Sequence, residues 1–159
     1  MALKINWLKL ISAIVICQGA GLIGSIFTSQ SVSTWYLTLQ KPSFNPPGWV
    51  FGPVWTLLFL LMGIALYLVW NAKTTGKTKN MAYLFFGIQY VLNIAWSYFF
   101  FYLQNPLAGF IEILILWLFI LLTIIYFYKI SKPAAYLLIP YILWVSFAAF
   151  LNYNLMILN

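Results

Sequence analysis

The sequence predicts an all-α integral membrane protein: a five-transmembrane-helix bundle with a long loop between the first two helices. Two observations lead to this prediction. Of the 159 residues, 65% are hydrophobic and only 6% are charged, whereas soluble domains carry roughly 25% charged residues. The apolar residues also fall into segments of the roughly 20 residues that a helix needs to cross a bilayer. The length suits a single domain over residues 1–159.

Each predicted span ends where the apolar sequence breaks. We expect spans at Ile5–Phe27, Gly48–Trp70, Asn80–Leu103, Pro106–Lys129 and Ala134–Leu158. The later connections are short, so consecutive helices must run antiparallel. The first connection, residues 28–47, is long, and long loops in compact domains are often lids or binding loops. We therefore predict a lid over one end of the bundle.

The lysines indicate the topology. All eight basic residues are lysines, and with five spans only Lys41 falls on the side opposite the others, Lys4 included. The positive-inside rule then places the N-terminus in the cytoplasm and the C-terminus outside. We expect a multi-pass protein of a bacterial cytoplasmic membrane. This arrangement explains the net charge of +7 without a nucleic-acid partner.

The first span carries small residues at intervals of four. They are Ala13, Cys17, Gly21 and Ser25, with Ala20 and Gly24 beside them. Such spacing lets helices approach closely. It serves either a homodimer face or packing inside the bundle, and both interpretations stay open.

The second span begins with an unusual run, residues 41–56, which holds four prolines, two glycines and two tryptophans. Proline and glycine both cost helix stability. Inside a bilayer, the backbone groups that they free must find partners in the protein or at a cavity. We therefore predict that this run bends the start of the helix and forms the rim and floor of a pocket, with Trp55 facing the ligand.

The third and fifth spans each carry a stripe of polar and aromatic side chains at helical spacing. The stripes are Gln89, Asn93, Trp96 and Phe100 in the third span, and Tyr141, Trp144, Ala148 and Asn152 in the fifth. Amides inside a membrane are costly unless they bond across helices or line a cavity. The stripes predict one amphiphilic pocket, while interhelical bonding alone is the alternative.

Glu112, in the fourth span, is the only acidic residue. It lies roughly 9 Å from the outer end of the span by helix rise. A protonated carboxyl bonded to a neighbouring helix is the interpretation we favour, and a proton-linked role is the alternative.

The composition excludes several kinds of chemistry. With no histidine, one cysteine and one acid, the chain lacks the ligands of most metal sites. It also lacks the residues of a histidine-based triad or a carboxylate pair. We expect no metal site and no covalently bound cofactor.

Several motifs together resemble the TspO/translocator protein family, also called tryptophan-rich sensory proteins or peripheral benzodiazepine receptors. They are TWYLTLQKPSFNPPGWVFGPVWTLLFLLMGIALYLVW, VLNIAWSYFFF, IEILILW and AAYLLIPYILWVSFAAFLNY. The resemblance covers nearly the whole chain. It implies a five-helix bundle, usually a homodimer, with a pocket for porphyrins such as protoporphyrin IX, haem-like tetrapyrroles, sterols or benzodiazepine-site ligands.

The resemblance also implies residue roles. Trp55 and Trp144 match two tryptophans linked to light- and oxygen-dependent porphyrin degradation in some bacterial members. The ligand-lining positions of the family match Trp35, Tyr36, Asn93, Trp96 and Ala148.

The chain departs from the family at three places. Phe44 stands where the family often has tryptophan, and we expect it to keep the aromatic contact with the ligand without the indole N–H. Glu112 stands where aspartate is commoner, and no base follows Tyr153 in the position of the family's sterol motif. We therefore do not expect sterol binding through that motif, which is weak in any case.

The leading hypothesis is a membrane receptor for porphyrin-like tetrapyrroles, with possible photo-oxidative degradation. In this hypothesis Lys41 pairs with a propionate and Asn93 orients the ring. A non-enzymatic sensory module is the first alternative. A small carrier of tetrapyrroles or lipids ranks last, because the sequence shows no inverted repeat of the kind many transporters have.

Overall fold

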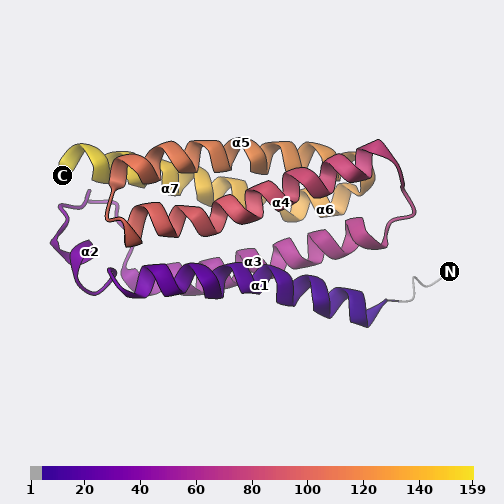
Figure 1. The fold of residues 1–159 in the computed structure, drawn as a ribbon, viewed down its shortest axis with the longest axis horizontal. Helices are drawn as coiled ribbons and strands as arrows, with labels where there is room; N and C mark the ends of the chain where they lie inside the picture. The colour runs from indigo at the N-terminus through magenta and orange to yellow at the C-terminus, as the bar shows by residue number, and fades with distance from the viewer. Residues whose placement is uncertain (1–4) are drawn as a thin grey trace.

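The protein is a bundle of long helices whose two ends differ in character (Figure 1). The structure is a computed structural model that describes residues 5–159, so Lys4 lies outside the described residues. Within that range five helices are long and apolar enough to cross a membrane. They are Trp7–Ser29, Gly48–Asn71, Lys77–Tyr102, Pro106–Ile130 and Lys132–Leu158. The predicted five-span helical bundle is confirmed.

Local sequence sets where several helices begin. Helix α1 (Trp7–Ser29) follows Asn6, whose side-chain oxygen accepts from the backbone N–H of Lys9 at 3.1 Å. Helix α5 (Pro106–Ile130) follows Asn105 in the same way. Asparagine caps satisfy backbone donors that the first helical turn leaves free. Helix α3 (Gly48–Asn71) begins directly after Pro47 and carries Pro53 inside its second turn.

The third span is not a uniform α-helix. Helix α4 (Lys77–Ser97) continues as a π-helical turn, η1 (Tyr98–Tyr102). Its wider turn is closed by a bond from the N–H of Leu103 to the carbonyl of Tyr98 at 2.9 Å. Phe100 and Phe101 in this turn are both buried. The turn holds one residue more than an α-helical turn, so the side chains beyond it are shifted in register relative to a regular α-helix.

The last span is interrupted, where the sequence predicted one continuous helix over residues 134–158. A short helix, α6 (Lys132–Leu137), is followed by its capping residue Leu138, and α7 (Ile139–Leu158) begins directly after it. Pro140 lies in the first turn of α7. Proline has no N–H to donate to the preceding turn, so the α-helical bonding breaks at this place.

The small residues of α1 serve packing inside the bundle. Ala13, Cys17, Ala20 and Gly24 are all buried in the single chain. A β-carbon on Gly21 would lie 2.8 Å from the ring of Phe59 on α3. These contacts show that small residues of α1 pack against other helices of the same chain.

The two ends of the bundle carry different features. The first loop, with the short helix α2 (Trp35–Thr38), lies at the same end as the C-terminus, and α1 begins at the other end (Figure 1). The side chain of Asn159 bonds both the N–H and the carbonyl of Gln40, at 2.9 and 3.0 Å. The loop is therefore tied to the end of α7.

Candidate functional site

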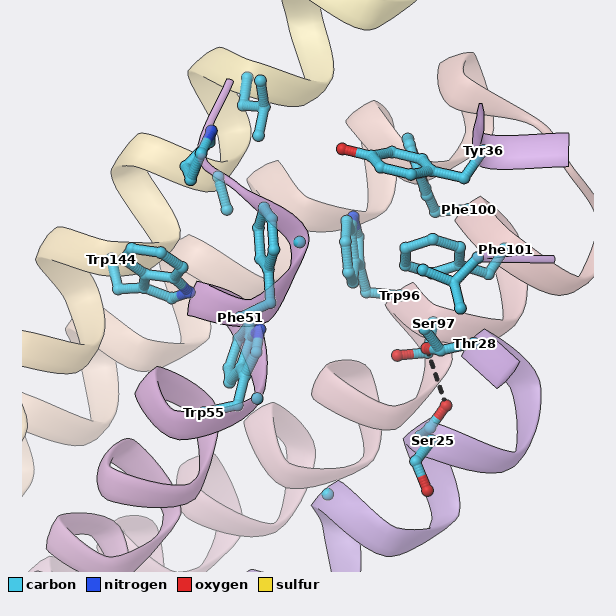
Figure 2. Close-up of a pocket in the computed structure, with 18 of the residues that line it drawn as sticks. Ser25, Thr28, Tyr36, Phe51, Trp55, Trp96, Ser97, Phe100, Phe101 and Trp144 are labelled. Carbon is cyan, nitrogen blue, oxygen red and sulfur yellow. Dashed lines mark hydrogen bonds between the residues drawn. The ribbon is translucent and has the colours of Figure 1, made fainter. Parts of the chain in front are cut away.

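A cavity of about 830 Å³ lies inside the bundle at the loop end (Figure 2). Helices α1, α3, α4 and α7, the π-turn η1 and the first loop all contribute to its wall. Ligand sites are commonly concave, mostly apolar, and about 300–1,000 Å³ in volume. Part of the predicted run of residues 41–56, from Asn45 to Thr56, contributes to this wall, as the proline and glycine pattern led us to expect.

Three indole rings from three different helices face the cavity: Trp55 on α3, Trp96 on α4 and Trp144 on α7 (Figure 2). The ring of Trp96 stacks on Phe100 with centroids 5.2 Å apart. Its Nε1–H donates to Oδ1 of Asn152 at 3.1 Å. Both interactions fix the orientation of this indole.

The indole nitrogen of Trp144 has no hydrogen-bond partner among the described residues, although it is buried. The ring lies edge-on to Phe51, with centroids 6.0 Å apart (Figure 2). Buried donors are nearly always bonded. The Trp144 ring lines the cavity, but its N–H is enclosed and is not open to the cavity space.

Behind the cavity wall, three side chains form a buried hydrogen-bonded chain. The amide nitrogen of Asn93 donates to the hydroxyl of Tyr141 at 2.8 Å, and this hydroxyl donates to Oε1 of Gln89 at 2.9 Å. Asn93 lines the cavity, whereas Tyr141 and Gln89 do not. The two predicted stripes thus meet at these bonds.

The rim is formed by the first loop. The Lys41 ammonium donates to the carbonyl of Leu39 at 3.1 Å and lies 4.8 Å from the ring centre of Tyr36. The Tyr36 hydroxyl donates to Oδ1 of Asn45 at 3.0 Å. Burial raises the pKa of Tyr36 above its usual value, against a smaller lowering by the Asn45 bond. Lys41 is the only basic residue among those that line the cavity.

Most of the residues predicted from the sequence as a ligand site are brought together at this cavity. Those that line it are Tyr36, Lys41, Trp55, Asn93, Trp96, Trp144, Ala148 and Asn152. Trp35 instead packs against Phe100 and borders a second cavity on the loop side. Phe44 is 40% exposed and stacks on Phe150 at 5.2 Å, outside the bundle.

Several lining residues were not singled out by the sequence. Gly21, Gly24 and Ser25 of α1 line the cavity, and their small side chains leave it room. The spacing of small residues was the available signal, but neither a homodimer face nor packing inside the bundle, the two interpretations it allowed, predicts a cavity wall. Phe101 also lines the cavity, and its spacing of four and eight residues from Ser97 and Asn93 was the available signal.

Glu112 is buried outside the cavity lining, and neither carboxyl oxygen bonds to a described residue. The expected bond to a neighbouring helix is therefore absent among residues 5–159. In the same range no three histidine, cysteine, aspartate or glutamate side chains lie together as a metal site would need.

Comparisons with known proteins agree with this architecture. The sequence model of the TspO/MBR family matches residues 13–158. The chain is 47% identical over 152 residues to "Tryptophan-rich protein TspO" of Chlorobaculum tepidum, covering 96% of both chains. It is 47% identical over 154 residues to the Archaeoglobus fulgidus protein of the same name, covering 97% of this chain and 99% of that one.

A more distant relative is the human "Translocator protein", which is 38% identical over 134 residues, or 82% of this chain and 78% of the human one. The family match, over residues 13–158, covers most of α1, the other four membrane helices and every residue that lines the cavity. The chain belongs to the TspO/MBR family of integral membrane proteins.

Proposed function

We propose that the cavity binds a porphyrin-like tetrapyrrole such as protoporphyrin IX, and that light and dioxygen degrade the bound ring. The observation that supports this proposal is the cavity itself, walled by three tryptophans from separate helices. A porphyrin is a broad apolar plate, and each aromatic pair contributes roughly 0.5–1.5 kcal/mol beyond burial. The reactivity would come from the excited ring with dioxygen as oxidant, so no acid–base residue is required.

One charged group suits the acidic edge of such a plate. Lys41 at the rim uses one of its three N–H donors on Leu39, which leaves the others for a propionate. This group favours a ligand with an anionic substituent at the rim.

The role of Lys41 is tested by comparing protoporphyrin IX with its uncharged dimethyl ester. Lys41→Gln should weaken binding of the acid by about 1.4- to fivefold, because a partly exposed ion pair contributes roughly 0.2–1 kcal/mol, and should leave ester binding unchanged. Tryptophan fluorescence quenching in detergent gives the dissociation constants. Lys73→Gln, in the connection between α3 and α4, is the matched control. Equal losses for both ligands would rule out the ion pair.

Degradation is tested by illuminating the purified protein with protoporphyrin IX in air and following the absorbance of the porphyrin. Trp55→Phe and Trp144→Phe should slow the decay. Trp49→Phe should not, because Trp49 is 76% exposed and does not line the cavity. Equal decay in all these samples and in empty detergent would exclude an enzymatic role.

That last outcome, combined with saturable fluorescence quenching, would identify a sensory module without turnover. The name "Tryptophan-rich sensory protein" of a Cereibacter sphaeroides relative favours this second function. Ligand flux into proteoliposomes that depends on Asn93 would instead identify a carrier of tetrapyrroles or lipids.

We also propose a homodimer in a bacterial cytoplasmic membrane, with the N-terminus inside. The orientation is supported by the lysines, since Lys41 lies at the loop end and Lys9, Lys73, Lys77 and Lys129 belong to the other end (Figure 1).

A further inference from the structure

We propose that Met62, Gln89 and Tyr141 hold the Asn93 amide with its oxygen toward the cavity, so that an occupant with an N–H or O–H donor beside Asn93 binds more tightly than one of the same shape without it. The inference rests on the cavity being the ligand site, as the proposed function has it. It does not require that the ligand be a tetrapyrrole. Gln89 and Tyr141 are then positioning residues, because they act through Asn93 without lining the cavity.

The direction of the hydrogen bonds determines which end of the Asn93 amide is free. A tyrosine hydroxyl has a single hydrogen, and that of Tyr141 is given to Oε1 of Gln89. The Tyr141 oxygen must therefore accept, and it accepts from Nδ2 of Asn93. Among the described residues, none donates to Oδ1 of Asn93. The carbonyl oxygen of this amide is the group left for the cavity.

Met62 sets the direction at the buried end of the chain. The Gln89 amide nitrogen lies 3.6 Å from the Met62 sulfur, which is an acceptor and has no hydrogen to give. If the Gln89 amide were turned over, its oxygen would face that sulfur without a donor. Tyr141 would then have to donate to Asn93. Because Met62, Gln89 and Tyr141 are each at most 1% exposed, no water competes for these positions.

The inference assigns a polarity to the deep part of the cavity. Asn93 on α4 presents a hydrogen-bond acceptor there. A flat ligand with an outward-pointing N–H on one edge satisfies Asn93. A ligand of the same shape without a donor leaves the amide oxygen unpaired, and an unpaired buried polar group is costly.

Three tricyclic probes of nearly equal shape test this polarity in the purified full chain. Carbazole carries an N–H donor, fluorene has a CH₂ group at the same place, and fluorenone has a carbonyl acceptor. Quenching of tryptophan fluorescence gives the dissociation constants. We expect the wild type to bind carbazole about three- to tenfold more tightly than fluorene, because that ratio corresponds to the net contribution of one hydrogen bond to the binding affinity.

Substitutions at Gln89 should change that preference in a directed way. Gln89→Met removes the acceptor for Tyr141, whose hydroxyl then donates to Asn93 and turns the amide nitrogen toward the cavity. Carbazole should lose its advantage over fluorene, and fluorenone should bind more tightly than it does to the wild type. Gln89→Glu keeps an oxygen facing Tyr141 and should retain the wild-type order. A purely structural role would weaken all three probes alike.

Tyr141→Phe is a second route, should Gln89→Met fail to fold. It releases the Asn93 amide, so the ratio of carbazole to fluorene affinity should fall to about one, because no hydrogen bond then distinguishes the two probes. An unchanged ratio in a folded Gln89→Met or Tyr141→Phe protein would overturn the inference, as would an equal change in Gln89→Glu. Failure of protoporphyrin IX to bind would overturn the proposed function and leave these ratios as they are.

Discussion

The contact between Gly21 on α1 and Phe59 on α3 gives the sharpest stability prediction. A β-carbon at position 21 would lie 2.8 Å from Cε2 and 2.9 Å from Cδ2 of the Phe59 ring. Carbon atoms in contact prefer about 3.5–4.0 Å. The ring cannot withdraw freely, because Phe59 is 3% exposed and stacks on Trp55 with centroids 5.6 Å apart.

Gly21→Ala should therefore be less stable than Gly19→Ala. The same β-carbon at Gly19 would meet only the Tyr90 hydroxyl, at 3.5 Å, which is an ordinary contact. Both substitutions gain the same helix propensity, about 1 kcal/mol, so their difference isolates the overpacking cost of about 1–3 kcal/mol. For a chain of this size each kcal/mol lowers Tm by about 2–4 °C.

Thermal unfolding in detergent, followed by tryptophan fluorescence, measures this difference. Porphyrin binding should also weaken in Gly21→Ala, because the displaced Phe59 ring pushes Trp55 into the cavity. In a Phe59→Leu background, Gly21→Ala should cost less, as expected for two residues in direct contact. A Gly21→Ala protein that melts at or above the Gly19→Ala value would refute the reasoning.

Two further predictions concern the cavity. Asn152→Leu should lower the free energy of unfolding by about 1–3 kcal/mol, because it leaves the indole N–H of Trp96 unbonded. The control is Asn154→Leu, on the exposed side of α7, because Asn154 bonds only within its own helix. Equal Tm values for the Asn152→Leu and Asn154→Leu proteins would contradict a stabilising role of the Trp96–Asn152 bond. Gly52→Leu should reduce porphyrin affinity, since Gly52 lines the cavity and has open space beside it. The control is Gly87→Leu, which should not change the affinity, because Gly87 is also beside open space but lies away from the cavity. Quenching titrations compare the two, and a Gly52→Leu protein with unchanged affinity would show that this space is not used.

The helical bundle was predictable because its signals are local and strong. Apolar length identified the five spans, and the prolines and glycines before Trp55 marked the cavity wall. The same local logic found Asn93 and Trp144, since residues at helical spacing share a face whatever lies opposite. It did not distinguish Asn93, which lines the cavity, from Gln89 one turn away, which is enclosed behind it.

Other features depended on contacts between distant segments. Whether Phe44 faces the ligand or packs on the outside of α7 depends on the path of a loop, which sequence periodicity does not describe. The π-turn after Ser97 and the break at Leu138 each change the register of a span, and a pattern that assumes regular helices misses both.

By itself the sequence determined the membrane class, the five spans, the family and the absence of histidine and of a second acid for acid–base chemistry. Composition and spacing are sufficient for these because each follows from residues close together in the chain. Only the tertiary structure decided which side chains share a cavity and in which direction the Gln89–Tyr141–Asn93 bonds run. The direction of a hydrogen bond depends on every partner at once, and here those partners come from helices α3, α4 and α7.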